Sequence, residues 1–393
     1  MAQYFTERLE KVFHMIFTSY NQEMAQEGLR QLELIVNNQQ SPEQTKHQAL
    51  RNDMTTSLEN EIDTKEDALK IANDPESREI ADAYALLARI YAGPRFTWEE
   101  SNFPENNMRT YQCLHDSIRR CSPIGTLQAL RINGTITPTV EKDMLISFND
   151  AFRIVYDYAE QGDAFCQYII GNVFFWRDDN RISLARDMIT PPRLSWTKRI
   201  QQSLQKGSIQ ERIGALQGTV SDETLQENAT TFAKEWFNKA LNNGLAMFQG
   251  NLRNIYIDEG DFDNARRVAL TAAELGNPTM MLYTGLDCHE HGKFEDAFTW
   301  FTKGASLGQA ESTAELADYY YHFYDTKELR RLIPYNPVKA IGLYRRAATK
   351  HFSDAGYAAL QAAFGYIFHI GHLPLDWGLI ADLTHMAATK ERF

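Results

Sequence analysis

The sequence predicts an all-α fold, an α-solenoid of stacked antiparallel helical hairpins, and two patterns along the chain support this prediction. The first is a repeat with an interval of 32 residues, in which glycines and alanines recur together: Gly244, Gly276 and Gly308, and Ala233, Ala265 and Ala297. A fixed period of about 20 to 50 residues is typical of stacked helical pairs. The second is the alternation of small and large residues at helical spacing before each glycine, which would end the helix as a C-cap.

The composition indicates a folded chain with a sizeable core and excludes several classes of partner. The 393 residues are 43% hydrophobic and include only 12 Pro and 22 Gly, so extended disorder is not expected. With 40 basic and 52 acidic residues the formal charge is −12, which disfavours nucleic acids and anionic membranes because both attract positive charge. We therefore expect no nucleic-acid partner.

No segment has the sequence pattern of a signal peptide or a membrane span. Charged residues interrupt the apolar positions of residues 1–17, and no stretch approaches about 18 consecutive apolar residues. The four cysteines match no zinc or redox spacing and fit reduced, buried thiols: Cys113, Cys121, Cys166 and Cys288. We expect a cytoplasmic protein without a transmembrane segment.

Along the chain, the predicted elements form two caps with a repeat array between them. Residues 1–75 have helical patterning without a clear repeat, and we interpret them as an N-terminal helical cap. The array covers 79–365, and helices end near positions 79, 122, 162, 207, 244, 276, 308 and 351. The variable spacing of these ends indicates insertion loops near 177–194 and 325–336. Residues 366–393 are expected to form a C-terminal capping helix.

A second helix follows each of these ends and carries a small residue where two helices would cross. In residues 162–174 the pattern consists of Cys166, Ile170, Gly171 and Phe174. A small residue is required at the crossing because a larger side chain would push the helix axes apart from their usual spacing of about 8–10 Å. The pattern therefore predicts closely packed helix pairs.

These residues resemble the Sel1-like repeat family, a relative of the tetratricopeptide repeats. The resemblance is carried by Ala-Glu-Gln-Gly-Asp-Ala at 159–164 followed by Gly171, and by the Ala297, Trp300 and Gly308 pattern, and it spans roughly 79 to 365. The resemblance implies a scaffold or adaptor that binds another protein or peptide. Because several proteins of this family are secreted by bacteria and act on host proteins, it also implies a variant in which this chain is exported into a host cell without a cleaved signal peptide.

In a curved stack of hairpins the inner surface is the expected place for a partner. Exposed inner positions should fall three and six residues after each helix end and one residue after each close-packing position. This rule predicts that the partner-binding residues are Arg89, Phe165, Tyr168, Asn172, Asn254, Asp318, Tyr321 and Tyr357. His322, the residue after Tyr321, is included with them. Asp82, Glu311 and Gln361 fall on the same surface. An ordinary hydrated groove is the alternative for each of them.

Residues 319–324 contain five aromatic side chains in six positions, which would point to all sides of a helix. Some of them must contact a loop or a partner, because tyrosine is favoured at interfaces. Packing against the insertion at 325–336 is the structural alternative.

The sequence contains no catalytic constellation, and we expect neither enzyme activity nor a cofactor nor a metal. Residues 287–291 (Asp-Cys-His-Glu-His) offer zinc-ligand types, but adjacent turn residues rarely converge on one ion. Asp178 and Asp179 fall in a charged loop, where solvation explains them. A competing hypothesis is an enzyme whose site lies in the N-terminal region or in the 177–194 insertion. A third is a module for a lipid headgroup or peptide that uses Arg330, Arg331, Arg345 and Arg346.

Overall fold

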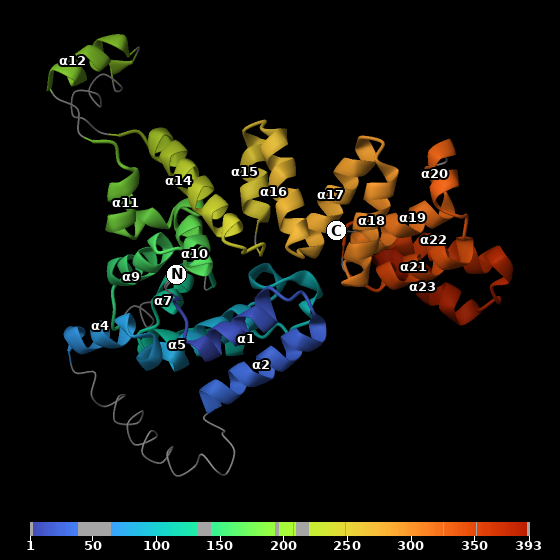
Figure 1. Ribbon diagram of the computed structural model, residues 1–393, viewed down its shortest axis with the longest axis horizontal. Coiled ribbons are helices and arrows are strands. Elements are labelled where there is room, and N and C mark those ends of the chain that lie inside the picture. Colours follow the sequence, from blue (N-terminus) through green and yellow to red (C-terminus); the bar gives the residue numbers. More distant parts are fainter. Residues whose placement is uncertain are drawn as a thin grey trace. The chain divides into compact units, whose positions relative to one another are not determined.

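The computed structural model describes residues 3–37, 64–132, 143–192, 196–206, 208–209, 220–247, 249–324, 326–350 and 352–390 (Figure 1). Every regular element in these ranges is a helix, so the predicted all-α class is confirmed. The chain divides into two compact units. Unit 1 comprises Met1–Ile16, Met24–Thr97 and Phe103–Leu245, and unit 2 comprises Phe17–Glu23, Trp98–Asn102 and Ala246–Phe393.

Unit 1 contains a stack of helical hairpins. Its helices are α1 (Glu7–Phe17), α2 (Gln22–Asn37), α4 (Lys65–Asn73), α5 (Pro75–Tyr91), η1 (Pro94–Phe96), α6 (Asn107–Arg119), α7 (Pro123–Ile132), α9 (Phe148–Glu160), α10 (Ala164–Phe175), η3 (Asp178–Asn180), α11 (Ser183–Ile189), α12 (Trp196–Gln205) and α14 (Asp222–Asn242). The turn between α1 and α2 belongs to unit 2. Helix α5 packs on α6, α7 on α9, α9 on α10, and α10 on α14. This succession is the stacking that the repeat pattern predicted.

Unit 2 is also a succession of paired helices. Its helices are η2 (Glu99–Ser101), α15 (Gly250–Asp258), α16 (Phe262–Glu274), α17 (Pro278–Glu290), α18 (Phe294–Ser306), α19 (Ala310–Tyr321), α20 (Lys327–Leu332), α21 (Pro337–Ala348), α22 (Ala355–Ile367), η4 (Ile370–His372) and α23 (Trp377–Lys390). From α15 to α19 each helix packs on the next, and α21 follows α19 in the stack. None of the helices in the described ranges combines the length and apolar character that a membrane crossing requires.

The three evenly spaced glycines end helices, as predicted. Gly244, Gly276 and Gly308 have φ values of +90°, +101° and +95°. This left-handed conformation favours glycine, because a side chain would clash there. After Gly276, the N–H of Asn277 donates to the carbonyl oxygen of Ala272 at 3.0 Å, and the equivalent bond follows the other two glycines. Each glycine therefore closes a helix and starts the reversal into the next one.

The small residues at the helix crossings are required, as the sequence predicted. A Cβ atom on Gly171 would lie 2.6 Å from the ring of Phe237, and one on Gly285 would lie 2.6 Å from the ring of Phe301. Real Cβ atoms do not approach carbon this closely, so a larger residue would force the helices apart. Glycine at these two positions sets the distance between α10 and α14 and between α17 and α18.

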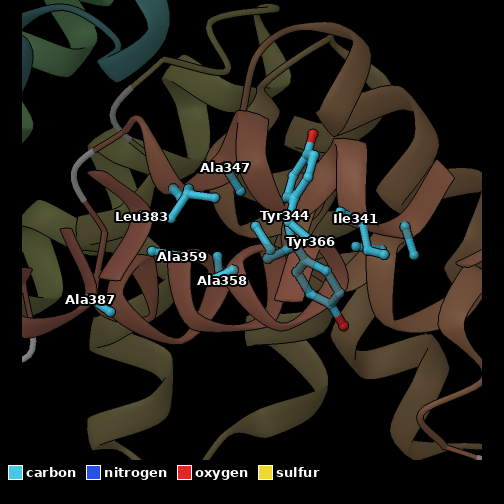
Figure 2. Packing of buried hydrophobic residues seen from close by; sticks show 14 of the residues in the cluster. Ile341, Tyr344, Ala347, Ala358, Ala359, Tyr366, Leu383 and Ala387 are labelled. Atoms are coloured by element: carbon cyan, nitrogen blue, oxygen red, sulfur yellow. The ribbon is translucent and has the colours of Figure 1, made fainter. Parts of the chain in front are cut away.

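The end of unit 2 is an alanine-rich core shared by α21, α22 and α23 (Figure 2). Tyr344 and Ile341 of α21 pack against the alanines of α22, and α23 contributes Leu383 and Ala387. The opposite side of α23 is exposed and includes Asp382, Thr384 and His385. The last helix thus has one buried and one polar face. The division into caps over 1–75 and 366–393 and an array over 79–365 stays a prediction.

The two segments that we expected to be insertion loops contain helices, so that expectation is wrong. In 177–194, η3 and α11 form, and α11 packs on α9 and α14 through buried Ala185 and Ile189. In 325–336, α20 forms and buries Leu329, with Ile333 just beyond it, among α17, α18 and α19. Both segments mix prolines or charges with a few apolar residues, and the burial of those apolar residues decides the local structure.

Candidate partner-binding surfaces

The predicted inner surface of unit 1 is covered by the chain itself. Arg89, Phe165 and Tyr168 were expected to be exposed, but their exposed fractions are only 3%, 4% and 6%. The rings of Phe5 and Phe13 lie 5.7 and 4.8 Å from the ring of Phe165. The expectation of exposure is wrong because repeat spacing shows which residues face inward but not which segment lies over them.

Arg89, Phe165 and Tyr168 are nevertheless brought together, as the spacing rule proposed. The guanidinium of Arg89 lies 5.6 Å from the centre of each of the two rings, and its Nη2 lies 3.5 Å from the hydroxyl oxygen of Tyr168. Such stacking of a guanidinium on aromatic faces is favourable inside a protein. Asn172, one turn beyond Tyr168 on α10, is only half-buried.

Tyr4 lies beside this surface in a network of buried polar groups from three helices. Its backbone N–H donates to the carboxylate of Asp163 at 2.9 Å, and its carbonyl oxygen accepts from Arg78 at 2.6 Å. Its hydroxyl donates to Asp82 at 3.3 Å and accepts from the N–H of Ile124 at 3.3 Å. Both backbone groups and the side chain of Tyr4 are therefore paired with groups that come from elsewhere in unit 1.

Arg78 and Asp82 form a buried ion pair at the centre of this network, with Nε and Oδ2 3.0 Å apart. Asp82 also accepts from the hydroxyl of Ser122 at 2.6 Å. Burial raises the pKa of Asp82 to about 6, although Arg78 and the hydrogen bonds oppose the change. Asp82 was expected on the exposed inner surface, and it is instead a structural carboxylate of the core.

In unit 2 the predicted residues gather where α19 meets α21 and α22. Asp318 was expected to be exposed, but it is buried. The hydroxyls of Tyr344 and Tyr357, from the helices packed around it, both donate to its Oδ1 atom, the latter at 3.5 Å. Burial raises the pKa of Asp318 to about 6, and the two hydroxyls act in the opposite direction. Tyr357 is half-buried and keeps part of its ring accessible.

Three carboxyl groups form a stripe along α19 at this place. Glu311, Glu315 and Asp318 follow one another at helical spacing, and Asp354 precedes α22 near enough to raise the pKa of all three. Burial is the larger cause, and with these neighbours it raises the pKa of Glu315 to about 7. The hydroxyl of Tyr324 donates to Glu315 at 3.0 Å. The spacing rule missed Glu315, because it treated each helix alone and did not look for charge on adjacent positions.

His322 and Tyr321 are tied to the segment that follows α20. His322 has a φ of +57° and ends α19, and its Nε2 lies 2.8 Å from the carbonyl oxygen of Ile333. Tyr321 lies 6.2 Å from the ring of Tyr335 and is half-buried. His322 therefore orders the end of α19, while Asn254, the remaining predicted residue, is exposed on α15.

The aromatic run at 319–324 packs largely within unit 2. Tyr319 is fully buried, and its hydroxyl lies 2.7 Å from Nδ1 of His289. The ring of Tyr324 lies 4.3 Å from the ring of His289, and Leu329 and Ile333 belong to the same apolar cluster. Packing against the 325–336 segment, the structural alternative, thus explains Tyr319 and Tyr324.

Asp178 and Asp179 of the 177–194 segment, considered as part of a possible enzyme site, are paired with arginines. In the described ranges, no three His, Cys, Asp or Glu side chains gather in the arrangement of a metal site. Asp178 and Asp179 are buried, contrary to the expectation of a solvated loop. Asp178 pairs with Arg131, and Asp179 pairs with Arg177 at 3.0 Å and Arg186 at 2.8 Å. Each carboxylate is neutralised by arginine, which is the geometry of a structural ion pair.

Two of the four arginines considered for a lipid headgroup, Arg345 and Arg346, are engaged by the chain. Arg345 donates to the hydroxyl of Tyr366 at 3.0 Å, and Arg346 donates to the carbonyl oxygen of Ala305 at 3.2 Å. Both line a cavity of about 500 Å³ between α21 and α23, together with Asp382 and Met386. A neighbouring carboxylate and apolar wall do not favour an anionic headgroup.

Solved structures that are similar to this chain include a Sel1 repeat protein and a protein with an SLR fold. One is a Sel1 repeat protein from Oxalobacter formigenes, at 18% identity over 63% of this chain and 81% of that chain, with a TM-score of 0.42. The other is a protective antigen of uropathogenic Escherichia coli with an SLR fold, at 15% identity over 82% of this chain and 79% of that chain, with a TM-score of 0.24. No protein-family model and no curated protein sequence matches the chain. The likeness concerns the fold alone, and the stacked hairpins are established by the contacts between this chain's own helices.

Proposed function

We propose that this chain is a protein-binding scaffold that holds a basic segment of its partner on one face of unit 2. We call this face the acidic face and define it by Glu311, Glu315, Asp318, Tyr321, Asp354 and Tyr357. The observation that carries the proposal is the combination, on one helix–helix junction, of four carboxyl groups with two partly accessible tyrosine rings. The stacked-hairpin fold supports the same class of function, because such stacks offer long binding surfaces.

The electrostatics of the acidic face favour a partner that carries lysine or arginine. Burial and repulsion from neighbouring carboxylates hold the carboxyls of Glu315 and Asp318 at raised pKa values, of about 7 and about 6. A cationic side chain placed between them would stabilise their ionised forms and would offset the repulsion from Asp354. The rings of Tyr321 and Tyr357 offer apolar area at a low cost in side-chain entropy, which is why tyrosine is common in binding surfaces.

We further propose the cytoplasm as the place of action. The four cysteines are free and unbridged, which fits a reducing compartment. Export into a host cell stays a prediction from the Sel1-like resemblance. An epitope-tagged chain that never leaves the producing cell during infection would refute it.

The proposed binding can be tested with full-length protein and a fluorescent 12-residue peptide that contains four lysines. We expect the lysine peptide to bind and a glutamate peptide of the same length not to bind. Glu315→Gln combined with Asp354→Asn should weaken binding about tenfold, which corresponds to about 1.4 kcal/mol. Raising the ionic strength from about 0.05 M to about 0.5 M should weaken it further.

The matched control removes two charges elsewhere in unit 2. Glu274→Gln with Glu290→Gln changes the net charge by the same amount at exposed positions of α16 and α17. The proposal fails if both double variants weaken binding equally, because the effect would then reflect overall charge. It also fails if the lysine peptide does not bind.

A further inference from the structure

We infer that the buried inner surface of unit 1 is a peptide-binding groove whose resident ligand is the chain's own segment 4–16. We call this segment the resident segment, and it begins with Tyr4 and Phe5 and continues into α1. The inference is independent of the acidic face, because every residue it uses belongs to unit 1.

The backbone of Tyr4 is bound in the way that receptors bind a peptide. Side chains, not a helix or sheet partner, pair with its N–H and its carbonyl group: Asp163 accepts the former and Arg78 donates to the latter. The two carboxylate oxygens of Asp163 have different partners. Oδ1 accepts from the N–H of Cys166 at 2.8 Å and caps α10, and Oδ2 accepts from the N–H of Tyr4. Recognition of a non-helical backbone by side chains of a helical array is suited to a ligand that can exchange.

The side chains of the resident segment fill sites on the same array. The Tyr4 ring lies 4.1 Å from the guanidinium carbon of Arg78 and 5.2 Å from the ring of Tyr158. Phe5 stacks on Phe165, and Thr6, the residue before α1, donates to Glu79 of α5 at 2.6 Å. The buried face of α1 is apolar and consists of Leu9, Val12, Phe13 and Ile16. The surface therefore suits a peptide in which an aromatic pair precedes an amphipathic helix.

A buried amide on α7, the helix whose N-terminal end binds Tyr4, has no hydrogen-bond partner in the part of the chain that the structure describes. Gln128 is 3% exposed, and neither its Oε1 nor its Nε2 makes a hydrogen bond. It lies on α7 one helical turn after Ile124, whose backbone N–H donates to the hydroxyl of Tyr4. A side-chain amide with a free donor and a free acceptor matches the N–H and C=O of a peptide backbone, and an unpaired buried amide is costly. The helix that binds Tyr4 thus has hydrogen-bonding groups that the resident segment does not use.

The test uses the full chain and a labelled synthetic peptide with the sequence of residues 3–17. Wild-type chain should bind it weakly, because the resident segment occupies the groove. The full-length variant Tyr4→Ala with Phe5→Ala should bind it at least tenfold more tightly, because its own segment holds the groove less well. A peptide that carries the Tyr4→Ala change should lose that gain. Adding Asp163→Asn to the chain should also remove it, since asparagine still caps α10 but presents an amide NH₂ where Tyr4 needs an acceptor.

Hydrogen exchange on the wild-type chain provides a measurement that does not depend on a variant. We expect the amides of α1 to exchange through a local opening, faster than those of α5, α7 and α10. A folded variant that does not bind the peptide would overturn the inference. So would α1 amides that exchange only together with the core helices, because the segment would then be an integral part of the fold.

Discussion

Replacing Asp318 by asparagine should stabilise unit 2 at neutral pH and leave it unchanged in acid. Asp318 is buried on α19, and its Oδ1 atom accepts from Tyr344 and Tyr357. Asparagine keeps an oxygen at that position and removes only the negative charge. The substitution therefore separates the cost of burying the charge from the value of the two hydrogen bonds.

The magnitude follows from the pKa of Asp318, which burial raises from its ordinary 3.8 to about 6. A group with a raised folded-state pKa favours the protonated form, so wild-type stability falls as the pH rises from about 4 to about 6. A pKa difference of about 2 units, at about 1.4 kcal/mol for each unit, corresponds to a loss of about 3 kcal/mol in the free energy of unfolding above pH 6. Asp318→Asn should recover a substantial part of this free energy of unfolding at pH 8 and none at pH 4.

The assay is thermal unfolding at pH about 4 and pH about 8, combined with hydrogen exchange of the slow amides in α19, α21 and α22. The exchange data are needed because a chain with two compact units need not unfold in a single two-state step. Asp263→Asn, at an exposed position of α16, is the matched control and should change neither measurement. If Asp318→Asn lowers stability equally at both pH values, the hydrogen bonds favour the carboxylate and the reasoning is wrong. A stabilised variant that binds the lysine peptide less well would indicate that the buried charge serves binding.

Three further predictions follow from packing and burial. Gly285→Ala should lower the free energy of unfolding by about 1–3 kcal/mol, because the added Cβ would meet a buried phenylalanine ring. Gly342→Ala, whose Cβ would meet nothing within 4 Å, should raise the free energy of unfolding by about 0.5–1 kcal/mol. Thermal unfolding measures both changes. Arg78→Met should cost about 3–5 kcal/mol by urea unfolding, and Asp82→Asn in the same chain should restore part of it; no recovery would contradict the ion-pair explanation. Cys288, the partly exposed thiol, should react first with a thiol reagent, and equal rates for all four cysteines would contradict the burial described.

Sequence analysis predicted the helical hairpins because their signals are local. A glycine such as Gly276 can end a helix because it adopts a positive φ. The interval from one such glycine to the next equals the length of one helical hairpin. Close-packing positions such as Gly171 and Gly285 are also readable, because a helix crossing requires a small residue wherever it occurs. The helical spacing of the apolar residues in 5–17 predicted a helix there, with its apolar side chains on one face.

The same pattern could not predict what that face would be buried against. The contact between Tyr4 and Asp163 joins residues 159 positions apart, and no periodicity in either segment records it. For the same reason the spacing rule found Phe165 and Tyr168 but took them to be exposed, and it found Asp318 without its hydroxyl donors on α21 and α22.

The sequence by itself determined that this protein is a stack of helical pairs, where those pairs reverse direction, and which positions bring two helices close. Only the tertiary structure decided which inner surface is covered, which carboxyls are buried, and where several of them meet. The physical reason is range: helix capping and periodicity act over a few residues, whereas burial and charge–charge interaction depend on segments that the folded chain brings together from far apart.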